Sequence, residues 1–257
     1  MYMTLFRKPA VFRPFSHLIA AESTRHGGVS QGPYASLNLG KNTADRPDHV
    51  AENLRLFCAA LGFSPGQIAW SRQVHGAEVS TVTNPGGASG FDALITQTPG
   101  IVLAVSVADC APVLVFDTEN QAVATIHAGW RGAAAGIVQK TLERMAAQFG
   151  TRGAHCVAYI GTCIDVCSFE VGPEVAAEFA TDFKRPGPGH RKFFIDLKKA
   201  CAAQLETFGV PSGQIEHSAY STVLHGNDYF SHRLSGGVTG RMLAVIGILG
   251  TMNPAEK

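Results

Sequence analysis

The sequence carries little charge and no excess of either sign. Only 16% of its 257 residues are charged, 46% are hydrophobic, and the net charge is +1. A composition this apolar excludes an intrinsically disordered chain. A near-neutral chain also lacks the general attraction for nucleic acids and anionic membranes that strongly basic proteins show, so we expect neither as a partner.

Long hydrophobic runs are absent too. The sequence contains no stretch of about 18 apolar residues, the length that a membrane-spanning helix needs. No apolar stretch of signal-peptide length follows the basic N-terminal residues Arg7, Lys8 and Arg13. We therefore expect a cytoplasmic protein whose six cysteines stay reduced. Of these, Cys58 and Cys201 fall on apolar helical faces and are predicted to lie in the core.

Apolar residues recur at helical spacing in four segments. Residues 45–61 and 133–149 each carry an apolar stripe with intervals of four, three and four residues. Residues 197–208 carry a similar stripe, and a shorter helix is predicted around residues 175–183. Asp45 is placed to cap the first helix and Gly62 to end it.

Other apolar segments have the length and composition of strands. Several are apolar on both faces, which is typical of sheets covered on both sides. The predicted strands are residues 101–107, 113–116, 122–126, 157–160 and 243–249. A short polar turn joins the second and third of them and predicts an antiparallel hairpin, hence a mixed sheet in a layered α/β fold. The Pro/Gly/basic segment 184–192 is predicted to be a surface loop, with a mobile flap as the alternative.

Three residues share one sequence context. His75 in SRQVHGAEV, Cys110 in SVADCAPV and His127 in TIHAGWRG each end a strand-like run just before a glycine or proline breaker. Strand ends are where α/β proteins place functional groups. Two histidines and a cysteine form a suitable zinc set with a fourth position open to water or substrate. Alternatively, the histidines are hydrogen-bonded structural residues and the cysteine is a buried thiol.

Two residues near these three in the sequence are predicted to support the site. Asp109 either orients the scaffold or faces the site, where its carboxylate could hold a ligand histidine or act as a general base. Arg131 lies in a glycine loop before a helix predicted to start near Ala133. The helix start and the guanidinium would favour an anion such as phosphate. The alternative is that Trp130 packs and Arg131 pairs with a surface acid; elsewhere in the chain, Arg233 is a further candidate anion contact.

Several segments, in this order, resemble the laccase-domain family, also called the YfiH or polyphenol-oxidase-like family. They are GGVSQGPYASLNLG, QVHG, FDALIT, the stretch around ADC, IHAGWRG, IGTCIDVCSFEVG, and FSHR followed by TGR. The resemblance covers about residues 20–250 and implies one domain over residues 1–257. It also implies a layered αββα core with mixed sheets.

The resemblance further implies zinc held by His75, Cys110 and His127, which coincides with the set reached from the residues. It implies a purine nucleoside enzyme that phosphorolyses adenosine, inosine, guanosine or methylthioadenosine, with some adenosine deamination. On this hypothesis the three ligands and Asp109 are the catalytic residues, with Asp109 as acid or base. The partners are then a nucleoside and phosphate, with candidate contacts at Arg25, Asn38, Gln73, Arg131 and Arg241.

Four other functions are weighed against this one. Multicopper laccase chemistry, which the older family label implies, needs many histidines on several coppers, and the converging set here is one site of three ligands. A metal-independent hydrolase would use Cys110 as nucleophile and a histidine as base. A non-catalytic zinc module is disfavoured because structural zinc usually has four protein ligands. Some relatives are also linked to cell-wall precursor quality control, which leaves the physiological substrate open.

Overall fold

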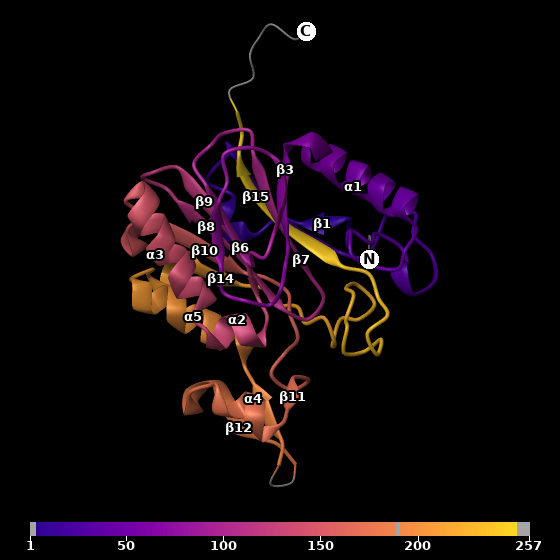
Figure 1. Ribbon diagram of the computed structural model, residues 1–257, viewed down its shortest axis with the longest axis vertical. Helices are drawn as coiled ribbons and strands as arrows, with labels where there is room; N and C mark the ends of the chain where they lie inside the picture. Colours follow the sequence, from indigo (N-terminus) through magenta and orange to yellow (C-terminus); the bar gives the residue numbers. More distant parts are fainter. Residues whose placement is uncertain (1–3, 189–190, 251–257) are drawn as a thin grey trace, which may run out of the picture.

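Two six-stranded sheets pack face to face, and helices cover the outer face of each (Figure 1). The computed structural model describes residues 4–188 and 191–250. The first sheet contains, in order, β1 (Phe6–Arg7), β2 (Leu18–Ser23), β15 (Met242–Ile248), β7 (Val102–Val107), β3 (Ile68–Arg72) and β5 (Gly86–Ser89). The second contains β14 (Ile215–His217), β10 (Cys156–Ile160), β8 (Ala111–Asp117), β9 (Ala122–Ala128), β6 (Ala93–Thr96) and β4 (Val79–Thr81).

Both sheets combine parallel and antiparallel pairs. In the first sheet, β7 is parallel to β3 and antiparallel to β15. In the second, β10 is parallel to β14 and antiparallel to β8. The predicted hairpin is confirmed, since β8 and β9 pair antiparallel over their whole length. The predicted mixed, layered αββα architecture is also confirmed.

The helices form the outer layers. Helix α1 (Pro47–Leu61) packs on the first sheet, and α3 (Ile137–Phe149) and α5 (Leu197–Phe208) pack on the second (Figure 1). This arrangement explains why the central strands are apolar on both faces. In β8, Phe116 packs in the core between the sheets, whereas its neighbour Val115 packs under α3 and α5. In β7, Leu103 faces the other sheet and Val102 faces α1.

Two predictions about helix ends are wrong. Asp45 does not cap α1, because its carboxylate accepts hydrogen bonds from Ser30 and Asn38, and the capping position is Arg46. The helix predicted over residues 133–149 is two helices, α2 (Trp130–Ala134) and α3. Gly136 separates them in the left-handed region, at φ 77°.

The segment after β10 departs most from the predictions. The short helix expected around residues 175–183 is α4 (Pro173–Ala177) followed by a 3₁₀ turn at Thr181–Phe183. The loop expected at residues 184–192 begins instead with β12 (Lys184–Pro186), because this segment pairs with β13 (Phe193–Ile195). With β11 (Glu170–Val171) these strands form a small sheet that projects from the molecule together with α4 (Figure 1). Residues 189 and 190 of the expected loop lie outside the described residues.

Two other expectations concern cysteines and membranes. All six cysteines are free, and Cys58 and Cys201 are buried in the core as predicted. Within residues 4–188 and 191–250, no helix is long and apolar enough to cross a bilayer.

Candidate functional site

The three predicted ligands come together at one end of the second sheet. His127 lies near the end of β9, and Cys110 directly precedes β8. Pairing of β8 with β9 sets Pro112 opposite His127, which brings Cys110 beside that imidazole. His75 comes from the loop after β3. The ligand atoms of the three side chains all lie within 4.8 Å of one another, so the group could bind a metal ion.

The backbone around the ligands is shaped for close approach. The backbone of both His75 and Asp109 lies in the left-handed region, at φ 59° and 85°, which residues other than glycine rarely adopt. Such strained residues cluster at functional sites. Gly129 lies against the ligands, and a Cβ there would sit 3.1 Å from the Cys110 sulfur and 3.2 Å from the His75 ring. Only glycine therefore fits this position without displacing a ligand.

A buried carboxylate, Asp92, orients the ligand set. His127 donates from Nδ1 to Asp92 Oδ1 at 2.7 Å, which leaves Nε2 as the nitrogen available to a metal. The backbone N–H groups of Val74, His75 and Gly76 donate to the same carboxylate. Burial raises the pKa of Asp92, but the bonds from His127 and these N–H groups outweigh it and hold the pKa below its usual value. The carboxylate thus stays ionised and fixes both the His127 ring and the His75 loop.

The carboxylate that holds a ligand histidine is not the one predicted from the sequence. A carboxylate that could hold a ligand histidine was sought at Asp109, next to Cys110. The structure instead supplies this contact from Asp92, at the start of the FDALIT segment. The available signal was an acidic residue directly before an apolar strand, where a buried charge needs a partner.

Cys110 and His127 form a coupled thiol–imidazole pair. Burial raises the pKa of Cys110, but the neighbouring His127 and His75 lower it to about 6. Burial lowers the pKa of His127, but the neighbouring Cys110 and Asp92 outweigh burial and raise the pKa to about 9. In the metal-free protein the pair is therefore held as thiolate and imidazolium at neutral pH. The thiolate is the form of cysteine that binds metal.

In the metal-free protein, we expect Cys110 to be alkylated faster than any other cysteine that is not exposed. With a pKa of about 6, its thiolate forms as pH rises from 5 to 7, so its alkylation rate should climb over that range and level off above it. Burial raises the pKa of Cys58, Cys156 and Cys201 to about 12, so these should stay unreacted. Mass mapping after iodoacetamide treatment, in a background carrying Cys167→Ser at the exposed cysteine, measures the rates. Added Zn²⁺ should protect Cys110, and equal labelling with and without metal would contradict its role as a ligand.

Replacing Asp92 with asparagine should weaken metal binding by about 10- to 100-fold, the usual cost of losing a carboxylate behind a ligand histidine. Asparagine fits the space but does not provide the charge that raises the pKa of His127. Competition against a chromophoric zinc chelator measures the affinity. Asp182→Asn, an exposed carboxylate on the projecting segment, is the matched control. An unchanged affinity in the Asp92 variant would show that the carboxylate does not support the ligand set.

A cleft of about 450 Å³ opens beside the three ligands. Among the predicted contacts, its lining includes Gln73, Asp109, Arg131 and Arg241. The lining also includes the aromatic side chains of Trp130 and Phe169 and the basic side chains of His232 and Arg233. Of these, Phe169 and His232 were not predicted as site residues; the available signals were an aromatic residue within the CSFEVG segment and a histidine within FSHR.

The other two predicted contacts lie outside the cleft lining. The Arg25 guanidinium donates to the backbone carbonyls of Ala35 and Gly226. Asn38 is fully buried, and its side-chain oxygen accepts from the backbone N–H of Arg241. The structure therefore places Asn38 behind Arg241, where it holds the backbone of a cleft residue in position.

Polar contacts already engage two of the residues that do line the cleft. Gln73 accepts from the backbone N–H of Ser106 and donates to its carbonyl, so its amide is locked in one orientation. Asp109 accepts from the Thr222 hydroxyl at 2.5 Å and from the Arg233 backbone N–H at 2.7 Å. Asp109 thereby ties the loop after β14 to the ligand set, and each of its oxygens keeps one lone pair directed elsewhere.

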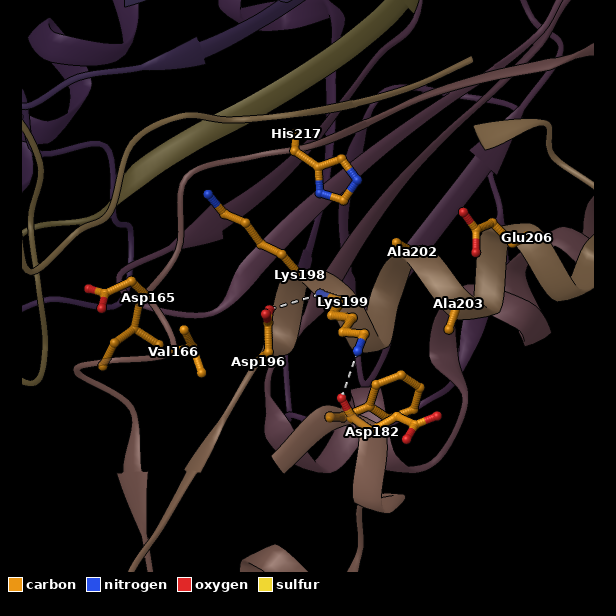
Figure 2. A pocket seen from close by; sticks show the side chains of 12 residues that line it. Asp165, Val166, Asp182, Asp196, Lys198, Lys199, Ala202, Ala203, Glu206 and His217 are labelled. Carbon is orange, nitrogen blue, oxygen red and sulfur yellow. Dashed lines mark hydrogen bonds between the residues drawn. The ribbon is translucent and has the colours of Figure 1, made fainter. Parts of the chain in front are cut away.

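A second cleft, of about 710 Å³, lies along α5 (Figure 2), and Ile164 lines both this cleft and the one beside the ligands. Its lining contains four carboxylates and two lysines: Asp165, Asp182, Asp196, Glu206, Lys198 and Lys199. The lysine ammonium groups are occupied, since Lys199 donates to the Asp182 carbonyl and Lys198 to those of Ser218 and Tyr220. None of the predicted site residues lines it, so the chemistry is assigned to the smaller cleft beside the ligands.

Known proteins resemble this chain along nearly its whole length. The sequence model of the family described as "Multi-copper polyphenol oxidoreductase laccase" matches residues 19–249. A "Purine nucleoside phosphorylase" of Bacteroides thetaiotaomicron is 39% identical, over 90% of this chain and 92% of the relative. "Purine nucleoside phosphorylase YfiH" of Escherichia coli is 38% identical, over 90% and 93%. The crystal structure of YlmD from Geobacillus stearothermophilus superposes with a TM-score of 0.90 at 31% identity, covering 96% of this chain and 99% of that one. These matches confirm the resemblance inferred from the sequence segments.

Proposed function

Because this chain belongs to the family described as multi-copper polyphenol oxidoreductase laccase, and its relatives are named purine nucleoside phosphorylases, we propose that it is a zinc-dependent purine nucleoside phosphorylase. The observation that carries the proposal is that His75, Cys110 and His127 line one cleft together with arginine side chains. The substrates are a purine nucleoside, such as adenosine, inosine, guanosine or methylthioadenosine, and phosphate.

Zinc suits these ligands better than a group of coppers. Two imidazoles and one thiolate would leave one position of a tetrahedral zinc open to water or substrate, and all three side chains line the cleft. Multicopper chemistry needs several histidine-rich sites, and residues 4–188 and 191–250 contain one such group. When bound, zinc supplies a Lewis acid that polarises an oxygen of the substrate or of phosphate.

Arg241 is placed to bind the attacking phosphate. Its side chain is half-buried and lies near Cys110 and Asp109. One terminal nitrogen donates to the carbonyls of Thr239 and Gly240, so the other terminal nitrogen and Nε remain for an anion. A guanidinium in this orientation can bind two phosphate oxygens at once.

Asp109 serves as the proton relay of the proposed reaction. A phosphate oxygen forms a bond to C1′ of the ribose while the bond from C1′ to the purine nitrogen breaks and its electron pair stays on the purine. Asp109, whose two oxygens accept hydrogen bonds from Thr222 and the Arg233 backbone, takes the proton of dihydrogen phosphate and passes it to that nitrogen. The products are a neutral purine and ribose 1-phosphate. Trp130 and Phe169 offer apolar faces on which the purine stacks.

A metal-independent cysteine hydrolase is the second candidate, and one observation favours it. Cys110, His127 and Asp92 stand in the order nucleophile, base and orienting carboxylate. In that case a chelator-treated protein would retain its full activity, and alkylation of Cys110 would remove it. In the phosphorylase, both treatments remove activity.

An end-point assay tests the proposal. Protein of measured metal content is incubated with adenosine and phosphate, with and without prior chelation, and the products are separated by chromatography. We expect adenine and ribose 1-phosphate from the metal-loaded protein only, and neither from His75→Ala. His17→Ala, at a histidine that directly precedes β2 and does not line the cleft, is the matched control. Inosine without adenine would assign the site to adenosine deamination, and no product from any of the four nucleosides would overturn the proposed function.

A further inference from the structure

The charge in the cleft exceeds what a neutral nucleoside and one phosphate require. Three arginines line it, Arg131, Arg233 and Arg241, and Asp109 is the single carboxylate in the lining. Within residues 4–188 and 191–250, no carboxylate forms an ion pair with any of the three. The whole chain carries a net charge of only +1, so this surplus is local to the cleft. A cleft lined by one sign of charge concentrates ligands of the other sign.

The three arginines differ in how many guanidinium N–H donors remain available to a ligand. Both terminal nitrogens of Arg233 donate to backbone carbonyls, at Ser168 and Glu170, on either side of Phe169. Arg233 therefore stabilises the segment that carries Phe169, one of the aromatic side chains in the cleft lining. Arg241 has one terminal nitrogen engaged and adjoins Cys110, which suits the attacking phosphate.

Arg131 has no such structural duty. In the part of the chain that the structure describes, its guanidinium makes no hydrogen bond or ion pair, and it lies over the Trp130 ring with 4.3 Å from Cζ to the centroid. The ring limits the positions of the cation without using its N–H donors. Arg131 is exposed at the rim, four residues after the ligand His127, on α2. Its five donors are therefore available to a ligand in the cleft.

We propose that the cleft accepts purine nucleoside 5′-monophosphates and that Arg131 binds their 5′-phosphate. This inference rests on the proposed function and names a substrate class for the same site. In a nucleotide, the 5′-phosphate is attached through C5′ to C4′, which lies across the ring oxygen from the reacting C1′. A purine stacked in the cleft with C1′ toward the ligand set and Arg241 then extends its 5′ end toward the rim. The cleft volume of about 450 Å³ is in the range of sites that enclose a ligand of this size.

The reaction on a nucleotide is balanced in the same way as on a nucleoside. The inorganic phosphate oxygen bonds to C1′, the C1′–purine bond breaks, and the proton of the attacking phosphate ends on the purine nitrogen. The products are the free purine and ribose 1,5-bisphosphate. The 5′-phosphate takes no part in bond making and contributes only binding energy.

Kinetics with AMP and adenosine at saturating inorganic phosphate test the inference. We expect the zinc-loaded protein to have a KM for AMP at least about tenfold below that for adenosine, as charge-assisted bidentate contacts provide. Arg131→Gln should raise the KM for AMP at least tenfold more than the KM for adenosine. Arg144→Gln, an exposed arginine on α3 outside the cleft, is the matched control and should change neither.

Each failure has a separate meaning. Equal KM values for AMP and adenosine, with adenosine turned over, would overturn the inference and leave the proposed function standing. AMP inhibition that inorganic phosphate relieves would also overturn it, because the 5′-phosphate would then occupy the acceptor site. Calorimetric titration with AMP and adenosine gives a readout independent of turnover. Arg131-dependent AMP binding without any phosphorolysis would support the anion site and overturn the proposed function.

Discussion

Replacing Cys110 with alanine is expected to abolish stoichiometric metal binding and to lower kcat/KM for nucleoside phosphorolysis by about a thousandfold or more. The thiolate is one of the three proposed ligands, and the neighbouring His127 and His75 lower its pKa to about 6, which favours the ionised form that a metal binds. Two imidazoles alone do not provide the charge that neutralises a divalent cation. A bound metal contributes several kcal/mol of transition-state stabilisation, and a thousandfold corresponds to about 4 kcal/mol.

Metal content by atomic spectroscopy and initial rates of adenine release measure the two effects together. Cys167→Ala is the matched control, because Cys167 is exposed and does not line the cleft. A Cys110→Ala protein that keeps both its metal and its activity would show that the thiol is not a ligand. Loss of activity with full retention of metal would instead favour the cysteine hydrolase.

Replacing Phe116 with alanine is expected to lower the free energy of unfolding by about 3 to 5 kcal/mol. Its ring is fully buried between the two sheets and packs edge-on to Phe15, with the ring centroids 5.0 Å apart. Pairing with β10 on one side and β9 on the other holds β8 in place, so the layers cannot easily close over the cavity. The cost therefore combines lost apolar burial with the cavity that remains.

Urea unfolding followed by fluorescence measures this change. Leu224→Ala is the matched control, since Leu224 is 67% exposed and its truncation should change stability by less than about 0.5 kcal/mol. The Phe116 variant should still bind one equivalent of zinc when folded, because the ring takes no part in the ligand set. A loss below 1 kcal/mol would mean that the inter-sheet core repacks around the missing ring.

Local patterns account for most of the elements that were predicted correctly. The helices over residues 47–61 and 197–208 follow from apolar residues at helical spacing and from glycines that end each helix. The break between α2 and α3 was missed, because the predicted helix was extended from its apolar stripe back to Ala133, through Gly136, whose left-handed backbone separates the two helices. The strand at Lys184–Pro186 was missed for a related reason. Its pairing with Phe193–Ile195 outweighs a local composition typical of a loop.

The sequence alone identified the candidate ligands, because His75, Cys110 and His127 each stand where an apolar run meets a chain breaker, and the structure brings their ligand atoms within 4.8 Å of one another. It also determined the layered class of fold, because strands apolar on both faces need cover on both sides. Only the tertiary structure decided which carboxylate supports the ligands. Asp92 reaches His127 through the pairing of β6 with β9, which joins residues 35 positions apart. Likewise, Arg131 and Arg241 line the cleft whereas Arg25 turns to backbone carbonyls, since the direction of a long side chain depends on neighbours that are distant in the sequence.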